Sequence, residues 1–263
     1  MIESEQRKMN MLANNRRLKI FEYIKRNTGA TTKELSKEFN ASGSTIRRDL
    51  EYLAKKKLII RSHNGAMVNS PHAESSFLFN YYRMREEKKL IAEKAVKFIK
   101  DYDFIAMSGG TTCYILASEI LNSTIQGLTI LTNSINITTL ILESVKDFQV
   151  IVAGGTPRKG TYECIGEITL RTIRNFNIDN FFVGVNGISL DGGISLSNIE
   201  EAEVAKEIRN RSHRTYVIAD HTKFGITKPA RLIELSEVDT IITDYVPKDF
   251  QEELSKYENL KIV

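Results

Sequence analysis

Hydroxyl and guanidinium side chains lie close together near the start of the chain, on Ser42, Ser44, Thr45, Arg47 and Arg48. Ser42 can cap the N-terminus of a helix. In that helix Ile46, Leu50 and Leu53 fall on one face, at spacings of four and three, which leaves the other side to the hydroxyls and guanidiniums. Hydroxyls near a helix N-terminus can reach base edges, and a guanidinium can bind guanine or phosphate. The pattern predicts a DNA recognition helix.

Supporting helices are expected before the recognition helix. Residues 17–26 carry apolar side chains at helical spacing, and residues 33–39 form a second amphipathic segment. Thr31 and Glu34 have the spacing of a capping box, which opens that second helix. Together these segments predict a helix-turn-helix.

A two-stranded wing is expected after the recognition helix. After the recognition helix the pattern changes, and residues 58–68 have the composition of strands. Within them Asn64-Gly65 suits a type I′ turn, in which both central residues need a positive φ. Arg61 and His63 lie in this hairpin, and we place both among the DNA-binding residues. The first domain is therefore predicted to be a winged helix-turn-helix, α with a small β wing.

Charge is divided unevenly along the chain. Residues 1–70 hold 15 Lys and Arg against 7 Asp and Glu, a net +8, whereas residues 71–263 hold 22 against 26, a net −4. RNA or a membrane surface is an alternative partner for the basic part. However, the sequence has neither an aromatic stacking ladder nor a basic amphipathic helix with large apolar anchors. Double-stranded DNA is the expected partner.

Length and composition bound the remaining possibilities. A winged helix needs about 70 residues, so a chain of 263 has room for a second domain with its own core. We expect domains at residues 1–69 and 81–263, joined by a linker at 70–80 of turn-forming composition. The chain has no run of 18 apolar residues and no apolar signal core, which favours a cytoplasmic protein with no membrane partner. Cys113 and Cys164 lie far apart without ligand spacing, so neither a metal nor a cofactor is expected.

The second domain repeats one theme, in which a short apolar run ends in small or polar residues and a helical pattern follows. The apolar runs are residues 104–107, 128–131, 149–152, 181–183, 215–218 and 241–244. Apolar strands alternating with helices predict an α/β domain with a mainly parallel sheet. In such sheets ligands bind outside the carboxyl ends of the strands, where these polar clusters fall.

One of these clusters has the composition of an anion site. Gly109 and Gly110 leave backbone amides accessible, Thr111 and Thr112 offer hydroxyls, and the helix that follows adds positive potential at its N-terminus. Lys223 offers a cation. The pattern favours a phosphate, although a tight turn without any ligand gives the same sequence.

Other clusters offer the directional donors and acceptors that sugar hydroxyls require. These residues are Asn133, Asn186, Glu200, Glu201 and Asp220. Glu200 and Glu201 also begin a helical stretch, where carboxylates are favourable at the N-terminus whatever the ligand. Both interpretations stay open from the residues alone.

The first domain resembles the DeoR family of bacterial transcriptional regulators. The resemblance covers residues 31–39, the run from Ser44 to Leu50, Leu53, and residues 60–66. Two departures are visible, because Lys57 and Asn64 stand where the family commonly has glycine.

The resemblance continues through the second domain, to about Asp244. The matching segments are Gly110-Thr111-Thr112, Thr132-Asn133-Ser134, Gly154-Gly155, residues 184–187, residues 199–202, and Asp220 with Lys223-Phe224-Gly225. The resemblance implies a fold similar to ribose-5-phosphate isomerase and glucosamine-6-phosphate deaminase, with a phosphorylated sugar as effector. It adds Ser134, Gly154 and Gly155 to the expected effector site. Ser108 stands where the family often has Asp, which leaves the identity of the sugar open.

The expected function is a DNA-binding regulator, a repressor of a carbohydrate-utilisation operon, that acts as a homo-oligomer on operator DNA and responds to a phosphorylated sugar. The alternative is a sugar-phosphate isomerase or deaminase with an appended DNA-binding domain. The related enzymes place carboxylates in the loop where this chain has Asn186, and an amide cannot act as a general base. We therefore expect no catalytic residues.

Overall fold

The computed structural model describes residues 2–27, 29–56, 58–62, 64–68 and 77–263. The chain forms two compact units, Met1–Arg83 and Met84–Val263. Each unit has its own core and is described by itself. This division confirms the expected two-domain fold.

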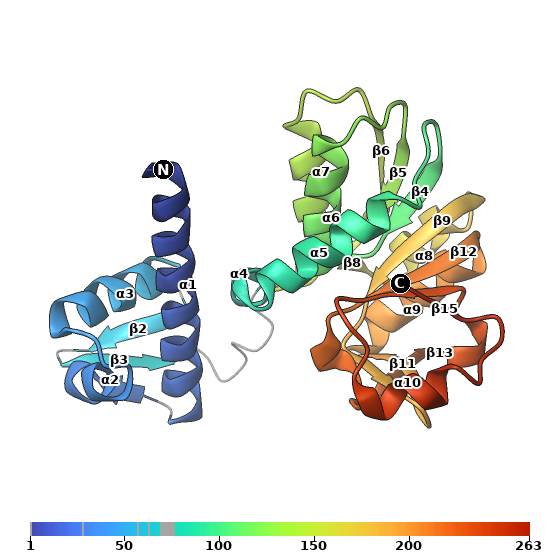
Figure 1. The fold of residues 1–263 in the computed structure, drawn as a ribbon. Coiled ribbons are helices and arrows are strands. Elements are labelled where there is room, and N and C mark those ends of the chain that lie inside the picture. Colours follow the sequence, from blue (N-terminus) through green and yellow to red (C-terminus); the bar gives the residue numbers. More distant parts are fainter. Residues whose placement is uncertain (1, 28, 57, 63, 69–76) are drawn as a thin grey trace. The chain divides into compact units, whose positions relative to one another are not determined.

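The first unit is a winged helix-turn-helix (Figure 1). Its elements are α1 (Ile2–Arg26), β1 (Gly29–Thr31), α2 (Thr32–Glu38), α3 (Gly43–Lys55), β2 (Ile59–Ser62), β3 (Gly65–Val68) and α4 (Phe77–Tyr82). The three strands form an antiparallel sheet in the order β1-β3-β2. The α1 helix extends well beyond the predicted residues 17–26 toward the N-terminus.

The core of this unit confirms the predicted apolar face of the recognition helix, α3. Ile46, Leu50 and Leu53 are buried and pack with Phe21 of α1 and Leu35 of α2. Because α3 holds these three side chains inward, its other side is left to solvent.

Side-chain caps fix where α2 and α3 begin. The Glu34 N–H donates to Thr31 Oγ1 at 3.2 Å, and the Thr31 N–H donates to Glu34 Oε2 at 2.7 Å, which confirms the predicted capping box. Ser42 Oγ accepts the Thr45 N–H at 3.2 Å, which confirms Ser42 as the N-cap of α3.

The wing is confirmed, but the predicted position of its turn is wrong. Ser62 pairs with Gly65 across the β2–β3 ladder, so Gly65 is a strand residue and has no positive φ. A Cβ on Gly65 would collide with the Ala30 carbonyl oxygen of β1. Glycine is therefore needed for the close approach of β1 to β3. His63 and Lys57 lie outside the described residues.

The segment between the domains differs in part from the expected linker. Residues 77–80 belong to α4, whereas residues 70–76 lie outside the described part of the chain. Within α4 the rings of Phe77 and Tyr81 stack with centroids 6.2 Å apart, a spacing of four that stabilises a helix. The domain boundaries taken from the sequence stay a prediction.

The second unit is an α/β domain built on one large sheet (Figure 1). The sheet contains β4 (Phe104–Met107), β5 (Thr129–Thr132), β6 (Gln149–Val152), β9 (Ile178–Gly184), β12 (Ser212–Ile218), β14 (Thr240–Ile242) and β15 (Lys261–Ile262). Its order is β15-β14-β12-β9-β4-β5-β6, and every neighbouring pair is parallel. This confirms the predicted parallel sheet.

Helices and short connections complete the unit. The helices are α5 (Arg85–Val96), α6 (Thr111–Asn122), α7 (Ile135–Leu142), α8 (Glu167–Ile173), α9 (Ile199–Asn210) and α10 (Lys248–Leu254), with the 3-10 turns η2 (His221–Lys223) and η3 (Leu235–Glu237). A hairpin joins β7 (Thr156–Pro157) to β8 (Cys164–Ile165). A small antiparallel sheet contains β10 (Gly187–Ser189), β11 (Gly193–Leu196) and β13 (Ala230–Ile233). The hairpin and the small sheet were not predicted.

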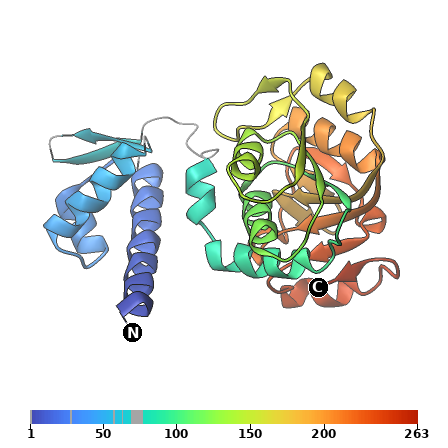
Figure 2. The same ribbon diagram turned by 90° about the horizontal axis from the view of Figure 1, so that it is seen from above.

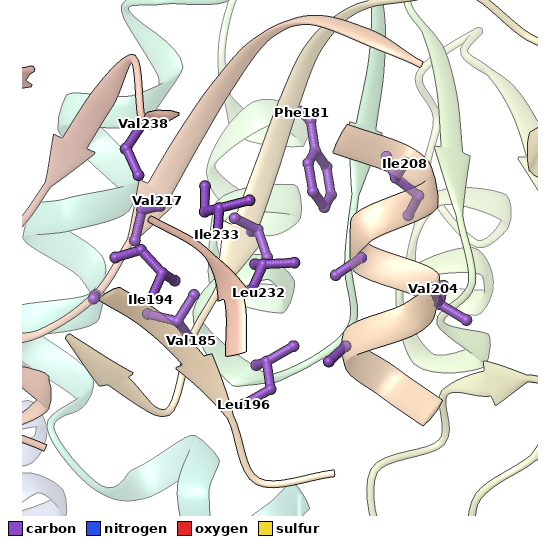
Figure 3. Packing of buried hydrophobic residues seen from close by; sticks show 14 of the residues in the cluster. Phe181, Val185, Ile194, Leu196, Val204, Ile208, Val217, Leu232, Ile233 and Val238 are labelled. Carbon is purple, nitrogen blue, oxygen red and sulfur yellow. The ribbon is translucent and has the colours of Figure 1, made fainter. Parts of the chain in front are cut away.

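Alternating side chains of β9 cover the two faces of the sheet. Phe181 joins the cluster that contains Val204 and Ile208 of α9, as Figure 3 shows. Phe182, the next residue, stacks on Tyr216 at 4.8 Å between ring centroids, and Phe98 after α5 lies 5.1 Å from Tyr216. Helices therefore lie on both faces, in three layers (Figure 2).

Candidate functional site

The recognition helix presents the predicted DNA-binding side chains on its solvent side. Ser44, Arg47 and Arg48 are exposed, and Thr45 is half-buried. Ser42 Oγ lies 2.9 Å from Ser44 Oγ and 2.8 Å from Thr45 Oγ1, so the capping hydroxyl also holds its neighbours. The exposed guanidiniums are thus placed beside hydroxyls at the helix N-terminus, as major-groove readout requires.

An ion-pair cluster that the sequence analysis missed fixes this helix against α1. Asp49 is only 1% exposed, and its carboxylate oxygens accept from Arg16 Nε at 2.6 Å and Arg17 Nε at 2.9 Å. The Arg17 guanidinium also lies over the Tyr52 ring, 4.2 Å from its centroid. Asp49 therefore positions the recognition helix.

The wing contacts the recognition helix through one predicted residue. Arg61 on β2 is exposed, and its Nη1 donates to the Arg47 carbonyl oxygen at 3.4 Å. The Arg61 guanidinium therefore lies next to the exposed face of α3. The predicted role of His63 falls outside the described residues.

In the second unit, the carboxyl ends of β4 and β5 bring four of the predicted effector residues, Gly110, Thr111, Thr112 and Asn133, to one edge of the sheet. Gly110 is the N-cap of α6 with φ +92°, a conformation that favours glycine. Thr111 and Thr112 follow in the first turn of α6, and both are buried. Asn133 follows β5, the neighbour of β4 in the sheet.

Glu163 lies against the glycine turn and Asn133 at this edge, although it was not among the residues predicted from the sequence. The residue is 9% exposed, and the Gly109 backbone amide donates to its carboxyl group. A Cβ on Gly109 would collide with the Glu163 side chain, which explains glycine at this position. The predicted glycine turn is therefore in contact with a carboxyl group of the protein itself.

Asn133 is the second polar group at this point. Its Nδ2 donates to the Cys164 carbonyl oxygen at 3.0 Å and lies 3.5 Å from Glu163 Oε2. Asn133 is 1% exposed, and its Oδ1 has no hydrogen-bond partner among the residues that the structure describes. A buried acceptor without a partner is costly, and a bound donor would remove that cost.

Charged groups from two elements surround Glu163. Arg158 Nη1 forms an ion pair with Glu201 Oε1 on α9. Burial, together with the nearby Glu201 carboxylate, raises the pKa of Glu163 to about 8, against the lowering effects of Asn133, Gly109 and Arg158. At neutral pH this carboxyl is mostly protonated.

Several predicted effector residues also have structural contacts within the protein. Ser134 caps α7 by accepting the Ile137 N–H at 3.4 Å, and Asn186 Oδ1 accepts the Ser197 N–H at 2.9 Å. The Gly154 carbonyl oxygen accepts from Thr169 Oγ1 at 2.8 Å. A Cβ on Gly155 would collide with the same Thr169 hydroxyl.

The remaining predicted residues differ in their position relative to Glu163. Glu201 contacts the Glu163 cluster through Arg158, whereas Glu200 next to it is exposed. Asp220 and Lys223 follow β12, two strands away from β4 at the same edge. Their role in an effector site stays a prediction.

Asp220 belongs to a second polar group at this edge. It is buried, and its Oδ1 accepts from the Thr222 N–H at 3.1 Å and from the Thr222 hydroxyl. Beside it, His221 Nδ1 lies 2.6 Å from Asp244 Oδ2, and the His221 ring stacks on Tyr245. Although burial opposes ionisation, hydrogen bonds from His221 hold the pKa of Asp244 below its usual value.

No metal centre emerges within the part of the chain that the structure describes, where no group of three His, Cys, Asp or Glu side chains could hold an ion. None of the described helices is long and apolar enough to cross a membrane.

Fold and site together define a class of protein, in which a winged helix-turn-helix unit precedes a parallel α/β unit with a polar site at its strand ends. Residues 16–72 match the DeoR-like helix-turn-helix domain, and residues 83–245 match the DeoR C terminal sensor domain. The chain belongs to the DeoR family, which confirms the resemblance seen in the sequence.

Named relatives cover most of the chain. The glycerol-3-phosphate regulon repressor of Escherichia coli is 33% identical over 228 residues, 87% of this chain and 89% of that protein. The lactose phosphotransferase system repressor of Staphylococcus epidermidis is 32% identical over 241 residues, 90% of this chain and 94% of that protein. Among solved structures, ribose 5 phosphate isomerase A from Neisseria gonorrhoeae covers 52% of each chain at 16% identity, with a TM-score of 0.40.

Proposed function

We propose that the protein is a repressor of a carbohydrate-utilisation operon, and that a phosphorylated sugar controls its affinity for operator DNA. One observation carries this proposal: α3 buries Ile46 and Leu50 while it exposes Ser44, Arg47 and Arg48 beside Arg61 of the wing. Such a helix matches the size of the major groove and the chemistry of its base edges.

The effector part of the proposal is supported by the chemistry of the strand ends. A backbone amide at Gly109, the N-terminus of α6 at Gly110 and the unpartnered Asn133 Oδ1 offer two donors and one acceptor within the same region. An anion with neighbouring hydroxyls uses both kinds of group. The relatives' names, a glycerol-3-phosphate regulon repressor and a lactose phosphotransferase system repressor, support the same class of effector.

Homo-oligomerisation follows from the size of the DNA interface. One winged helix buries too little surface for strong discrimination between sequences, so symmetric half-sites bound by a symmetric assembly are expected. The protein would carry out this function in the cytoplasm, where bacterial operators are found.

Binding to promoter fragments, measured by fluorescence anisotropy at several salt concentrations, tests the DNA-binding role. Arg48→Ala should lose about 1 to 3 kcal/mol and relax preference at one base pair if Arg48 contacts a base. If it contacts phosphate, all sequences should weaken alike and the salt slope should fall by about one. The matched control is Arg214→Ala, which removes an exposed guanidinium from the second unit. Equal effects of the two substitutions would contradict the proposal.

Enzymatic turnover is the weaker candidate. Asn186, which follows β9, carries an amide that already accepts the Ser197 N–H, and an amide cannot abstract a proton. Incubation with aldose and ketose phosphates should therefore give no isomer exchange. Exchange at enzyme-like rates would support the isomerase alternative.

A further inference from the structure

The Glu163 carboxyl occupies the position where an anion would be expected to bind. It accepts the Gly109 amide, which is one of the groups assigned to the effector, and its Oε2 lies 3.5 Å from Nδ2 of Asn133, the residue whose Oδ1 is also assigned to the effector. An anionic ligand that binds the Gly109 amide would need the donor that the Glu163 carboxyl already occupies. The two therefore exclude each other.

The loop that carries Glu163, residues 158–163, adopts a tight and locally strained conformation. The Arg158 N–H donates to the Glu163 carbonyl oxygen at 2.8 Å, and the Tyr162 N–H donates to the Arg158 carbonyl oxygen at 3.0 Å. Gly160 has φ +99°, and Tyr162 has φ +62° although it is not glycine. A bulky residue in the left-handed region is unfavourable, so this loop stores strain that its release would relieve.

The surroundings of Glu163 disfavour its ionised form. Glu201 on α9 is the charged group from the opposite element, and it is paired with Arg158 of the loop itself. Two thiols, Cys113 on α6 and Cys164 on β8, also interact with it. Burial raises the pKa of both thiols, that of Cys113 to about 12, so neither thiol ionises near neutral pH.

We propose that Glu163 is a built-in competitor of the effector: its carboxyl holds the Gly109 amide and the Asn133 carboxamide in the ligand-free protein, and the anionic group of the effector displaces it. This inference rests on the proposed function of the sensor unit. Displacement moves Glu163 into water and releases the 158–163 loop. The competitor thereby sets the effector concentration at which the regulator responds.

Displacement changes the proton content of the protein in a definite direction. In the ligand-free state Glu163 holds its proton up to about pH 8, whereas in water a carboxyl loses it near 4.5. Between these values each binding event releases up to one proton. The affinity for an anion should therefore rise with pH, by as much as about tenfold per pH unit, and level off above pH 8.

Inorganic sulfate is the appropriate probe, because unlike a phosphate ester it does not itself titrate in this range. Isothermal titration of the full chain with sulfate from pH 5.5 to 8.5 should show the rise in the wild type. Glu163→Gln should bind sulfate without this pH dependence. Glu163→Ala should bind about 10 to 100 times more tightly, if the site is open in about 1 to 10% of wild-type molecules.

The control is Glu167→Gln, which changes a neighbouring exposed carboxylate that pairs with Arg174 at 2.8 Å. It should keep the wild-type affinity and pH profile. Binding of glycerol 3-phosphate at pH 8 distinguishes failure of the competition from failure of the effector site. If it binds wild type, Glu163→Gln and Glu163→Ala equally, and sulfate affinity is independent of pH in the wild type, the competition is overturned while the effector site stands. If neither probe binds any of these proteins, the effector site itself is overturned.

Discussion

Replacing Glu163 by Gln should change how the stability of the protein depends on pH. In the folded wild type the pKa of Glu163 is raised to about 8, while in the unfolded chain it returns to about 4.5. The folded state therefore binds the proton more tightly, and the stability gained from it is complete below pH 4.5. That stability is lost as the pH rises through 8. Glutamine has nearly the same shape and no proton to lose.

The size of the effect follows from the two pKa values. One pKa unit corresponds to about 1.4 kcal/mol, so the wild type should lose roughly 3 to 4 kcal/mol relative to the Gln variant between pH 5 and pH 8. This is an upper value, because local opening of the 158–163 loop lets the carboxyl ionise in water at a lower cost. Other ionisable groups are common to both proteins and cancel in the difference.

Urea denaturation followed by circular dichroism at pH 5, 6, 7 and 8 measures this difference in the free energy of unfolding. Glu167→Gln serves as the control, and its profile should run parallel to that of the wild type. If the Glu163→Gln profile also runs parallel to the wild type, Glu163 does not hold a proton in the folded state, and the reasoning is refuted.

Two further substitutions test the first unit. Asp49→Ala removes the carboxylate that binds two arginines of α1 and should lower stability by about 1.5 to 3 kcal/mol, measured by urea denaturation; an unchanged midpoint would contradict the positioning role. Gly65→Ala places a methyl group against the Ala30 carbonyl oxygen, so β1 and β3 must separate. It should cost about 1 to 3 kcal/mol and weaken DNA binding, whereas wild-type behaviour in both assays would show that the strands adapt freely.

Local patterns made much of the fold predictable. The apolar run at 104–107 coincides with β4, because the polar residues Asp103 and Ser108 bound it on either side, and the run at 149–152 coincides with β6. The caps at Thr31 and Ser42 were predictable because a cap depends only on residues three positions apart in the sequence. The parallel order of the sheet followed from the alternation of strands and helices.

Features that depend on distant contacts were not predictable from one sequence. Asp49 looks like an ordinary polar residue of an amphipathic helix, and only its partners Arg16 and Arg17, more than thirty positions earlier, make it a buried ion pair. Glu163 lies in a loop between two short strands, and its proximity to Gly109 arises when the hairpin folds over the strand ends. A lone glutamate in a polar loop gives no sequence signal for either burial or a raised pKa.

The most direct test of the central claim is the affinity of the full chain for its operator in the presence and absence of a phosphorylated sugar. Promoter fragments of neighbouring carbohydrate genes identify the operator by footprinting, and anisotropy then gives the dissociation constant with each sugar phosphate of a panel. A cognate effector should change operator affinity about 5- to 150-fold, a coupling of about 1 to 3 kcal/mol. Sugar phosphates that bind the protein at saturation and leave its operator affinity unchanged would contradict the account.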